Sequence, residues 1–302
     1  MNTTFVIDGG AGRVITAIPA LEKYAMNNPN DDFRVLTAGW ESLYWAHPVL
    51  QNRTYNINQK GVFDLHMKGR RVIHPEPYQL NEYYSQQKHL IECFDQEINK
   101  TNEHSDLDKP NLYLTPQEHY AGQKLLQESR KKTGKQKVIV LQPYGSGIRI
   151  DNDKPFDETY RSLDVDFTLK LIYNLSKNCT VIYFGEKQFY HPGDSYSINV
   201  NDNGSDLRMY MSLIANCDYF IGVDSVGQHM ARAFNKPATV ILGATFEQNV
   251  SYPNFNIYRN KSKPTYVPIR LSQIDCEFAN NLNCNTMKFD EEDIPKILET
   301  IK

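Results

Sequence analysis

The chain has 302 residues, which is enough for two domains that each bury a core. Charged residues make up 23% of it, and its formal net charge is −3. Basic and acidic residues number 16 and 16 through residue 135 and 17 and 20 after it, so neither half has the overall basic charge of a protein that holds nucleic acid mainly through phosphates. No apolar run approaches the roughly 20 residues that cross a bilayer, and no basic segment followed by an apolar stretch marks a signal peptide, so we expect a soluble, cytoplasmic protein.

The first predicted elements alternate between strand and helix. A short apolar strand at 3–8 leads into a glycine-rich turn, and the residues at 14–25 have helical apolar spacing. A second strand is predicted at 33–36, followed by a short helix at 41–46. This alternation is typical of a Rossmann-like unit built on a parallel sheet.

Residues 51–75 are predicted to form short β-like pieces, followed by a helical stretch from about 81 to 100. This region carries one local basic cluster, formed by Lys68, Arg70 and Arg71. A solvated hairpin edge is one interpretation of the cluster, and a contact surface on the acceptor side for an anionic group is the other.

The second half begins after a break in the pattern. A strand-like piece at 112–114 precedes a helix that a capping-box pattern starts at Thr115 and that runs to about residue 132. Because Gly134 interrupts the chain there, the domain boundary is predicted at about residue 135, giving domains 1–135 and 136–302. Further strands are predicted at 138–142, 180–184, 219–223 and 238–242, and helices at 167–175, 205–215 and 290–301.

The most informative segment is the junction between the strand at 219–223 and the helix that follows it. The first backbone N–H groups of a helix are unpaired and carry partial positive charge, so such a junction can hold a phosphate. A strand, a turn of this kind, a helix and a further strand point to a nucleotide-type ligand. Asp224 can alternatively serve mainly as the N-cap of the helix.

The same segment has the run Asp224-Ser225-x-Gly227-x-His229-x-Ala231, followed by Asn235-Lys236-Pro237 and Leu242–Thr245. This run resembles the donor-site motif of glycosyltransferase family 9, the heptosyltransferase-like enzymes. The family usually has Thr where this chain has Ser225. The family's N-terminal pattern is similar to residues 12–21, and its Cys-Met tail to residues 284–287, whereas residues 51–110 match nothing in the family.

The resemblance implies an α/β fold of the GT-B type, in which two Rossmann-like domains face each other across a cleft. The N-terminal domain would then take the acceptor and the C-terminal domain the nucleotide-sugar donor. The last helix is expected to pack back on the N-terminal domain.

The resemblance also implies a set of donor-binding residues. The loop after the strand at 138–142 would bind the donor phosphate, with glycines that let the backbone approach closely, although a plain glycine turn is an equal interpretation of each residue. Glu186 would bind the donor ribose, and His229 the donor phosphate or sugar. A solvated loop glutamate is an equal interpretation of Glu186, and a packed or capping residue is the alternative for His229. The complete predicted donor set is Gly12, Gly145, Ser146, Arg149 or Lys154 as the cation, Glu186, Asp224, Ser225, Val226 and Gly227.

Arg13 is the main departure from the family pattern. The family has an aspartate there, held to be the base that deprotonates the acceptor hydroxyl, and a guanidinium cannot do this because it stays protonated. Asp8, at the end of the predicted strand at 3–8, is the favoured replacement for this base. Alternatively, Glu76 or His74 supplies the base, or the reaction needs no base. Arg13 would then hold an anionic acceptor group or the leaving phosphate.

The leading hypothesis is an inverting glycosyltransferase that needs no metal and no cofactor besides its nucleotide-sugar donor. The acceptor is a glycan or a hydroxymethylated base in DNA, and the oligomeric state stays open. The alternatives are a nucleotide-sugar epimerase or hydrolase and a non-catalytic nucleotide-sugar binding protein. A dehydrogenase is disfavoured because the glycines after the first strand are misplaced for a dinucleotide fingerprint.

The five cysteines fit no zinc motif in their spacing, and their odd number favours reduced thiols in a cytoplasm. A disulfide or a metal site is the less favoured interpretation for Cys276 and Cys284.

Overall fold

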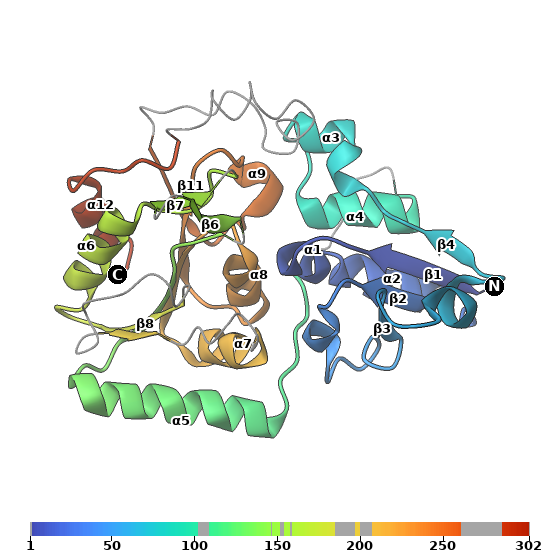
Figure 1. The fold of residues 1–302 in the computed structure, drawn as a ribbon, viewed down its shortest axis with the longest axis horizontal. Coiled ribbons are helices and arrows are strands. Elements are labelled where there is room, and N and C mark those ends of the chain that lie inside the picture. Colours follow the sequence, from blue (N-terminus) through green and yellow to red (C-terminus); the bar gives the residue numbers. More distant parts are fainter. Residues whose placement is uncertain are drawn as a thin grey trace. The chain divides into compact units, whose positions relative to one another are not determined.

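The computed structural model describes residues 2–101, 109–145, 147–151, 154–157, 159–184, 197–199, 207–260 and 286–301. Contacts within the chain group it into two compact units, Met1–Thr115 and Pro116–Lys302 (Figure 1). Each unit contains its own parallel sheet, which confirms the predicted α/β class.

The first unit is built on a four-stranded parallel sheet in the order β3-β2-β1-β4. Every residue of β1 is buried, as expected for a strand covered on both faces. The strands are β1 (Thr3–Ile7), β2 (Arg34–Thr37), β3 (Thr54–Asn56) and β4 (Arg71–Ile73). The helical segments are α1 (Ala11–Thr16), α2 (Ile18–Asn27), η1 (Glu41–Tyr44), η2 (Phe63–Met67), η3 (Pro77–Gln79), α3 (Asn81–Tyr84) and α4 (Leu90–Asn99).

A buried carboxylate ties the start of β1 to α2. Asp31 accepts hydrogen bonds from the Thr3 amide at 3.0 Å, from Thr3 Oγ1 at 2.6 Å and from the Tyr24 hydroxyl at 2.6 Å. Burial raises the pKa of Asp31, but the hydrogen bonds from Thr3 and Tyr24 outweigh burial and hold this pKa below its usual value. The ionised carboxylate is therefore the form that stabilises the first unit.

Asp31→Ala is expected to lower the free energy of unfolding by about 3 kcal/mol, because it removes hydrogen bonds to a charged acceptor and leaves buried donors unsatisfied. Since the pKa of Asp31 is lower in the folded than in the unfolded state, its contribution is complete above about pH 4 and is lost as the pH falls through the folded value. Urea unfolding of both proteins at neutral pH and near pH 3 measures this difference. Asp64→Ala, which removes an exposed carboxylate, is the control and should change stability by less than about 0.5 kcal/mol.

The second unit is built on a six-stranded parallel sheet in the order β12-β11-β10-β5-β8-β9, with a separate antiparallel hairpin. The sheet strands are β5 (Val138–Gln142), β8 (Thr180–Tyr183), β9 (Ser197–Asn199), β10 (Tyr219–Val223), β11 (Ala238–Leu242) and β12 (Asn256–Arg259), and the hairpin strands are β6 (Ile148–Asp151) and β7 (Lys154–Asp157). The helices are α5 (Pro116–Thr133), α6 (Val165–Leu175), α7 (Leu207–Asn216), α8 (Val226–Ala233), α9 (Glu247–Val250) and α12 (Asp293–Glu299).

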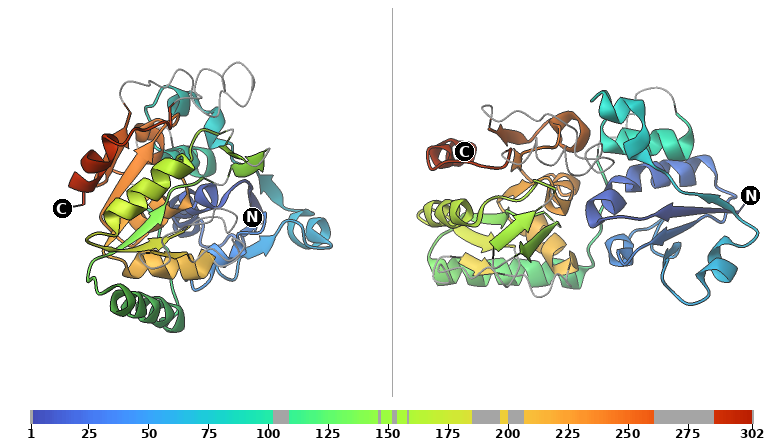
Figure 2. Two further views of the ribbon diagram at one scale, coloured as in Figure 1. Left: turned by 60° about the vertical axis from the view of Figure 1, so that its left-hand side comes forward. Right: turned by 45° about the horizontal axis from the view of Figure 1, so that its top comes forward.

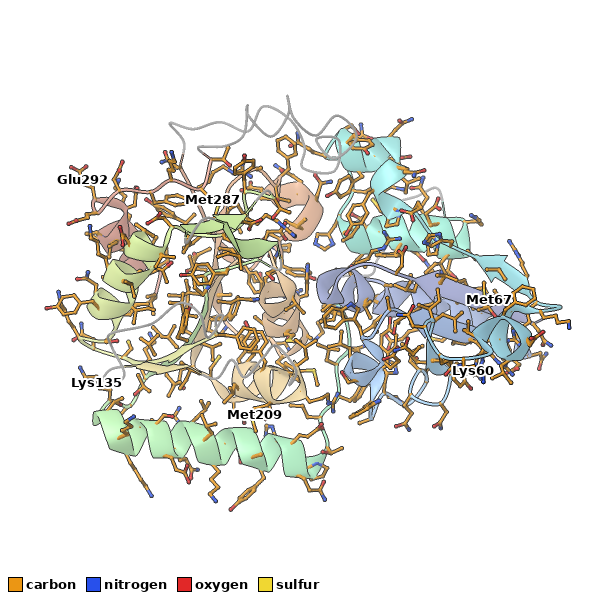
Figure 3. All side chains as sticks on the ribbon, viewed as in Figure 1. Lys60, Met67, Lys135, Met209, Met287 and Glu292 are labelled. Carbon is orange, nitrogen blue, oxygen red and sulfur yellow. The ribbon has the colours of Figure 1, made fainter. Side chains whose placement is uncertain are left out.

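Helices cover both faces of this sheet. α6 and α12 lie on one face and α7 and α8 on the other (Figure 2). The core on the first face is formed by side chains of β5, β8 and β10 together with α6 and α12, and Met287, labelled in Figure 3, packs into it. Within the second unit, α12 packs against α6 through Ile294 and Ile297. The packing of this last helix on the N-terminal domain stays a prediction.

The helix α5 belongs to the second unit, although the sequence placed the domain boundary after it. Ser212 Oγ of α7 donates to the Glu118 carbonyl at 2.6 Å, and the Arg208 guanidinium pairs with the Glu118 carboxylate. A Cβ atom at Gly122 would lie 2.1 Å from Ser212 Oγ, so glycine permits this close approach of α5 and α7. The two units therefore divide at 115/116, before the helix.

Two smaller expectations also differ from the structure. The predicted strand at 112–114 pairs with no described strand. The predicted helix at 14–25 is two helices, α1 and α2, because the chain turns at Ala17 and restarts with Pro19 near the beginning of α2. None of the described helices is both long and apolar enough to span a membrane.

Three of the five cysteines lie in the described part of the chain, and all three are free thiols in buried positions. Burial raises the pKa of Cys93 and of Cys217 to about 12, so neither is a thiolate at neutral pH. Reduced thiols in a cytoplasm stay a prediction, and Cys276 and Cys284 lie outside the described residues.

Candidate functional site

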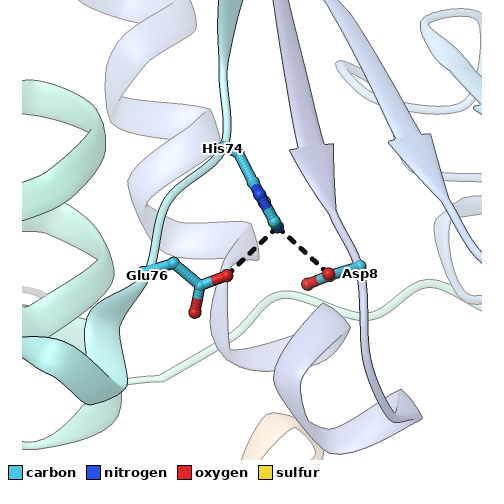
Figure 4. A group of neighbouring side chains, drawn as sticks. All are labelled: Asp8, His74 and Glu76. Carbon is cyan, nitrogen blue, oxygen red and sulfur yellow. Dashed lines mark ion pairs between the residues drawn. The ribbon is translucent and has the colours of Figure 1, made fainter.

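Four charged or titratable side chains meet at the carboxyl edge of the sheet in the first unit. Figure 4 shows three of them, Asp8, His74 and Glu76. Asp8 follows β1 directly, and His74 and Glu76 follow β4. Because β1 and β4 are parallel neighbours, with Phe5 opposite Ile73, their ends deliver these side chains to one place. Arg13 reaches the same place from α1.

Arg13 is a buried cation between the two carboxylates. Its Nη2 lies 3.2 Å from Asp8 Oδ1 and 3.4 Å from Glu76 Oε1, and it donates to the Pro75 carbonyl at 2.6 Å. The ring of Tyr78 lies 5.3 Å from the guanidinium carbon, and the side chain of Arg13 is 8% exposed. These contacts hold the guanidinium in place beside the carboxylates, where it is a permanent positive charge because arginine stays protonated in proteins.

His74 links the same two carboxylates on their other side. Its Nε2 atom lies 3.1 Å from Asp8 Oδ2 and 3.2 Å from Glu76 Oε1. Ionised carboxylates only accept hydrogen bonds, so we assign a proton to His74 Nε2. With a neutral His74 the four groups carry one net negative charge, and with an imidazolium they are neutral.

This cluster is accessible to a ligand. The side chains of Asp8 and His74 are 41% and 45% exposed, and that of Glu76 is 33% exposed. Since Asp8 Oδ1 is buried against Arg13, a ligand can reach only Oδ2 of this carboxylate. The cluster thus presents a carboxylate oxygen and an imidazole to a ligand.

The trio Asp8, His74 and Glu76 also has the donor set of a divalent-cation site, and its ligand atoms lie within 4.8 Å of one another. Arg13 opposes a cation there, because its guanidinium contacts both carboxylates. The sequence predicted no metal site.

The predicted basic residues on the acceptor side do not join this cluster. Arg71 pairs with Thr3 at the amino edge of the sheet, which is the opposite edge from Asp8. Arg70 is 7% exposed, and its guanidinium bonds to Thr4 Oγ1 at 2.9 Å and to the Thr3 carbonyl at 3.0 Å. Lys68 pairs with Asp64 at 3.3 Å on the surface, so the three residues form no shared anion site at the carboxyl edge of the sheet.

In the second unit, the turn before α8 is held by a residue that sequence reasoning missed. Gln142, the last residue of β5, accepts from the Gly227 amide at 3.0 Å and donates to Ser225 Oγ at 3.1 Å. The Tyr210 hydroxyl donates to the same Gln142 oxygen at 3.0 Å. A polar residue that ends a buried strand beside β10 is the signal that could have identified it.

Asp224 is a buried carboxylate beneath this turn, 8% exposed. It accepts from Gln228 Nε2 and from Thr245 Oγ1, both at 2.8 Å, and thereby joins α8 to the loop after β11. The alternative role as N-cap is wrong, because Ser225 occupies the N-cap position. Val226 and Gly227 begin the helix, as the motif predicted.

His229 lies in α8 and is buried, 4% exposed, with its Nδ1 2.8 Å from the Tyr252 hydroxyl. Gly145 follows β5 and donates its amide hydrogen to Ser162 Oγ at 3.0 Å. Gly12 lies in α1 beside Arg13. Among the other predicted donor residues, Ser146 and Glu186 lie outside the described residues, and of Arg149 and Lys154 only the backbone, in the hairpin β6–β7, is described.

Solved structures of glycosyltransferases share this fold over the whole chain. A glycosyl transferase of family 9 from Veillonella parvula is 11% identical, with a TM-score of 0.70 over 99% of this chain and 96% of its own. The ADP-heptose LPS heptosyltransferase II of E. coli is 12% identical, with a TM-score of 0.67 over 100% and 98%. The E. coli heptosyltransferase WaaC, solved with ADP-2-deoxy-2-fluoro heptose, is 13% identical, with a TM-score of 0.57 over 92% and 99%.

No protein-family model and no curated protein matches the sequence. The similar solved structures confirm the predicted resemblance to glycosyltransferase family 9 at the level of the fold. The roles of the individual residues stay predictions.

Proposed function

We propose that the protein is a glycosyltransferase that moves a sugar from a nucleotide-activated donor to an acceptor hydroxyl. The observation that carries the proposal is the accessible Asp8 carboxylate, held by Arg13 and His74 at the carboxyl edge of a parallel sheet. This edge is where open α/β sheets bind their ligands. The fold shared with family 9 structures supports the same conclusion.

In the proposed reaction, the acceptor oxygen attacks the anomeric carbon of the donor sugar from the face opposite the diphosphate. A new C–O bond forms, the bond between the anomeric carbon and the phosphate oxygen breaks, and the configuration inverts. The hydroxyl proton passes to Asp8 Oδ2, and the nucleoside diphosphate leaves with the electron pair of the broken bond. A GT-B arrangement would present the donor from the second unit to the acceptor on the first.

Each part of the site has a separate role in this proposal. Arg13 and His74 orient the carboxylate of Asp8. The positive charge of Arg13 also stabilises the negative charge of that carboxylate before it takes the proton. The start of α8 holds the diphosphate, because a helix N-terminus favours an anion. Gln142 fixes the shape of that turn.

A glycan is the acceptor that we favour over a base in DNA. One similar structure is that of the ADP-heptose LPS heptosyltransferase II of E. coli, and another was solved with ADP-2-deoxy-2-fluoro heptose, so ADP-heptose is the first donor to test. The basic cluster at 68–71 and the aspartate missing at position 13 left a base in DNA open as the acceptor. Arg71 of that cluster pairs with Thr3, at the other edge of the sheet from Asp8.

Thermal unfolding with a panel of ADP-, UDP- and GDP-sugars tests donor binding. A donor present at 100 times its dissociation constant should add roughly 2.7 kcal/mol to the free energy of unfolding. If no nucleotide or nucleotide sugar shifts the transition, the proposal fails. For a donor that binds, incubation without acceptor distinguishes the alternatives: an epimerase or hydrolase converts the donor alone, a transferase needs the acceptor, and a binding protein does neither.

Transfer is expected to proceed without a metal ion. The Arg13 guanidinium already supplies a positive charge to Asp8 and Glu76, so removal of divalent cations with EDTA should change the rate by less than about twofold. Rates measured after EDTA dialysis, and again after adding Mg²⁺ or Mn²⁺, check this. A loss of activity that Mn²⁺ restores would instead assign Asp8, His74 and Glu76 as a metal centre.

A further inference from the structure

One surface of the first unit combines exposed apolar side chains with an excess of positive charge. We define the η2 surface as Lys60, Phe63, Leu65 and Lys68 with the arginines around Asp32, namely Arg34, Arg53 and Arg70. Figure 3 labels Met67, the last residue of η2, and Lys60, which precedes this helix by three residues.

The helix η2 turns two large apolar side chains toward solvent. Phe63 is 60% exposed and Leu65 is 61% exposed. His66, between Leu65 and Met67, is buried, and its ring stacks on Tyr55 with 3.9 Å between the ring centres. The buried histidine anchors the segment, so the exposure of Phe63 and Leu65 belongs to a fixed conformation.

Positive charge collects beside these side chains. Three guanidinium groups approach the single carboxylate of Asp32, which neutralises only one of them, at 3.3 Å from Arg70, 3.7 Å from Arg34 and 3.9 Å from Arg53. Arg34 also donates to the Leu65 carbonyl and lies 3.1 Å from His66 Nδ1, so this charge directly adjoins η2.

The η2 surface is therefore cationic on an anionic protein. Its five basic groups face two carboxylates, Asp32 and Asp64, an excess of three positive charges on a chain whose net charge is −3. Exposed apolar side chains rimmed by cations are the pattern that binds the headgroup region of an anionic membrane.

We propose that the η2 surface docks the protein on an anionic phospholipid bilayer. Phe63 and Leu65 enter the boundary between headgroups and acyl chains, while the two lysines and the partly exposed Arg34 and Arg53 contact lipid phosphates. Arg70 is buried beneath them and adds its charge to the field of the surface without such a contact. A single-stranded nucleic acid would also use cations and an aromatic ring, but it gives Leu65 no apolar partner, so the membrane is the occupant that the observations favour. This proposal does not depend on the glycosyltransferase activity.

Co-sedimentation of the full chain with phospholipid vesicles tests the proposal. The protein should bind vesicles of phosphatidylcholine with about 30% phosphatidylglycerol, bind pure phosphatidylcholine much more weakly, and lose binding as salt screens the charges. The double variant Phe63→Ser/Leu65→Ser should lower the partition coefficient by about tenfold or more, because it removes the apolar contribution. Lys60→Gln and Lys68→Gln should each lower it by about fivefold.

Matched controls come from α5 in the second unit. Tyr120→Ser removes another ring that is 66% exposed, and Lys124→Gln another exposed lysine, and both variants should bind vesicles as the unchanged protein does. All variants change exposed side chains, so their melting temperatures should match.

The proposal is overturned if the unchanged protein does not sediment with the anionic vesicles, or if the double serine variant sediments equally well. It is also overturned if the surface binds DNA but not vesicles, which a mobility-shift assay with the two lysine variants would reveal. A donor-induced thermal shift that persists in the double serine variant would separate this surface from the proposed donor site.

Discussion

Asp8→Asn is expected to lower kcat for sugar transfer by about 10³-fold, which is the typical contribution of a general base. The amide has the shape of the carboxylate but cannot take the acceptor proton. Donor binding should be unchanged, because the donor contacts are assigned to the second unit. Initial rates with donor and acceptor, together with the donor-induced thermal shift, measure the two effects separately.

Three comparison variants identify the base. Glu76→Gln should lower kcat by only about tenfold, since Glu76 is assigned to hold Arg13 and His74 and not to take the proton. His74→Asn should lie between the two, because it loosens the contact of 3.1 Å to Asp8. Glu128→Gln, which changes an exposed carboxylate on α5, should leave the rate unchanged. If Glu76→Gln abolishes transfer while Asp8→Asn retains it, Glu76 is the base and the assignment to Asp8 is wrong.

Gly227→Ala is expected to lower the free energy of unfolding of the second unit by about 2–4 kcal/mol. A Cβ atom there would lie 2.4 Å from Gln142 Oε1, 2.4 Å from the Tyr210 hydroxyl and 2.6 Å from Phe220 Cζ. These atoms are buried, and the Tyr210 hydroxyl is hydrogen-bonded to Gln142 Oε1. Making room for the methyl group would move Gln142 Oε1 away from residue 227 and break its hydrogen bond to the Gly227 amide. The donor-induced thermal shift should disappear with that hydrogen bond.

Denaturant unfolding of the variant, followed by circular dichroism, measures the loss. Gly10→Ala is the stability control, because a Cβ atom at Gly10 meets nothing within 4 Å and the backbone there has φ of −80°. It should cost less than about 1 kcal/mol. A Gly227→Ala protein as stable as the unchanged one would show that the turn adapts to a methyl group and that its packing is looser than the distances indicate.

The sequence predicted the second unit more completely than the first. The strand at 219–223, the turn at Asp224 and Ser225 that begins α8, and the strand at 238–242 are local, because hydrophobic runs and turn residues specify them within a few residues. Gln142 was missed since its role depends on β5 lying next to β10, and the sequence separates these strands by more than 70 residues.

In the first unit, the decisive information is also long-range. Asp8, His74 and Glu76 were each considered as the base, but only the pairing of β1 with β4 brings them together, and residues 71–73 give a weak strand signal because they are partly exposed. The basic cluster at 68–71 was expected to contact the acceptor, and testing this expectation also requires the pairing of β1 with β4, which the sequence does not give. Arg70 faces inward to satisfy the start of β1, which the residue order alone does not reveal.

The hydrogen bonds that Gln142 makes to Ser225 and Gly227 join groups of the chain itself and involve no group of a ligand. The conformational entropy of this turn is therefore lost during folding and not again at each binding event, so the turn is preorganised for its ligand. Under the proposed function, ligands that differ only in their sugar should associate at similar rates. Discrimination among them would then appear in how long each complex lasts.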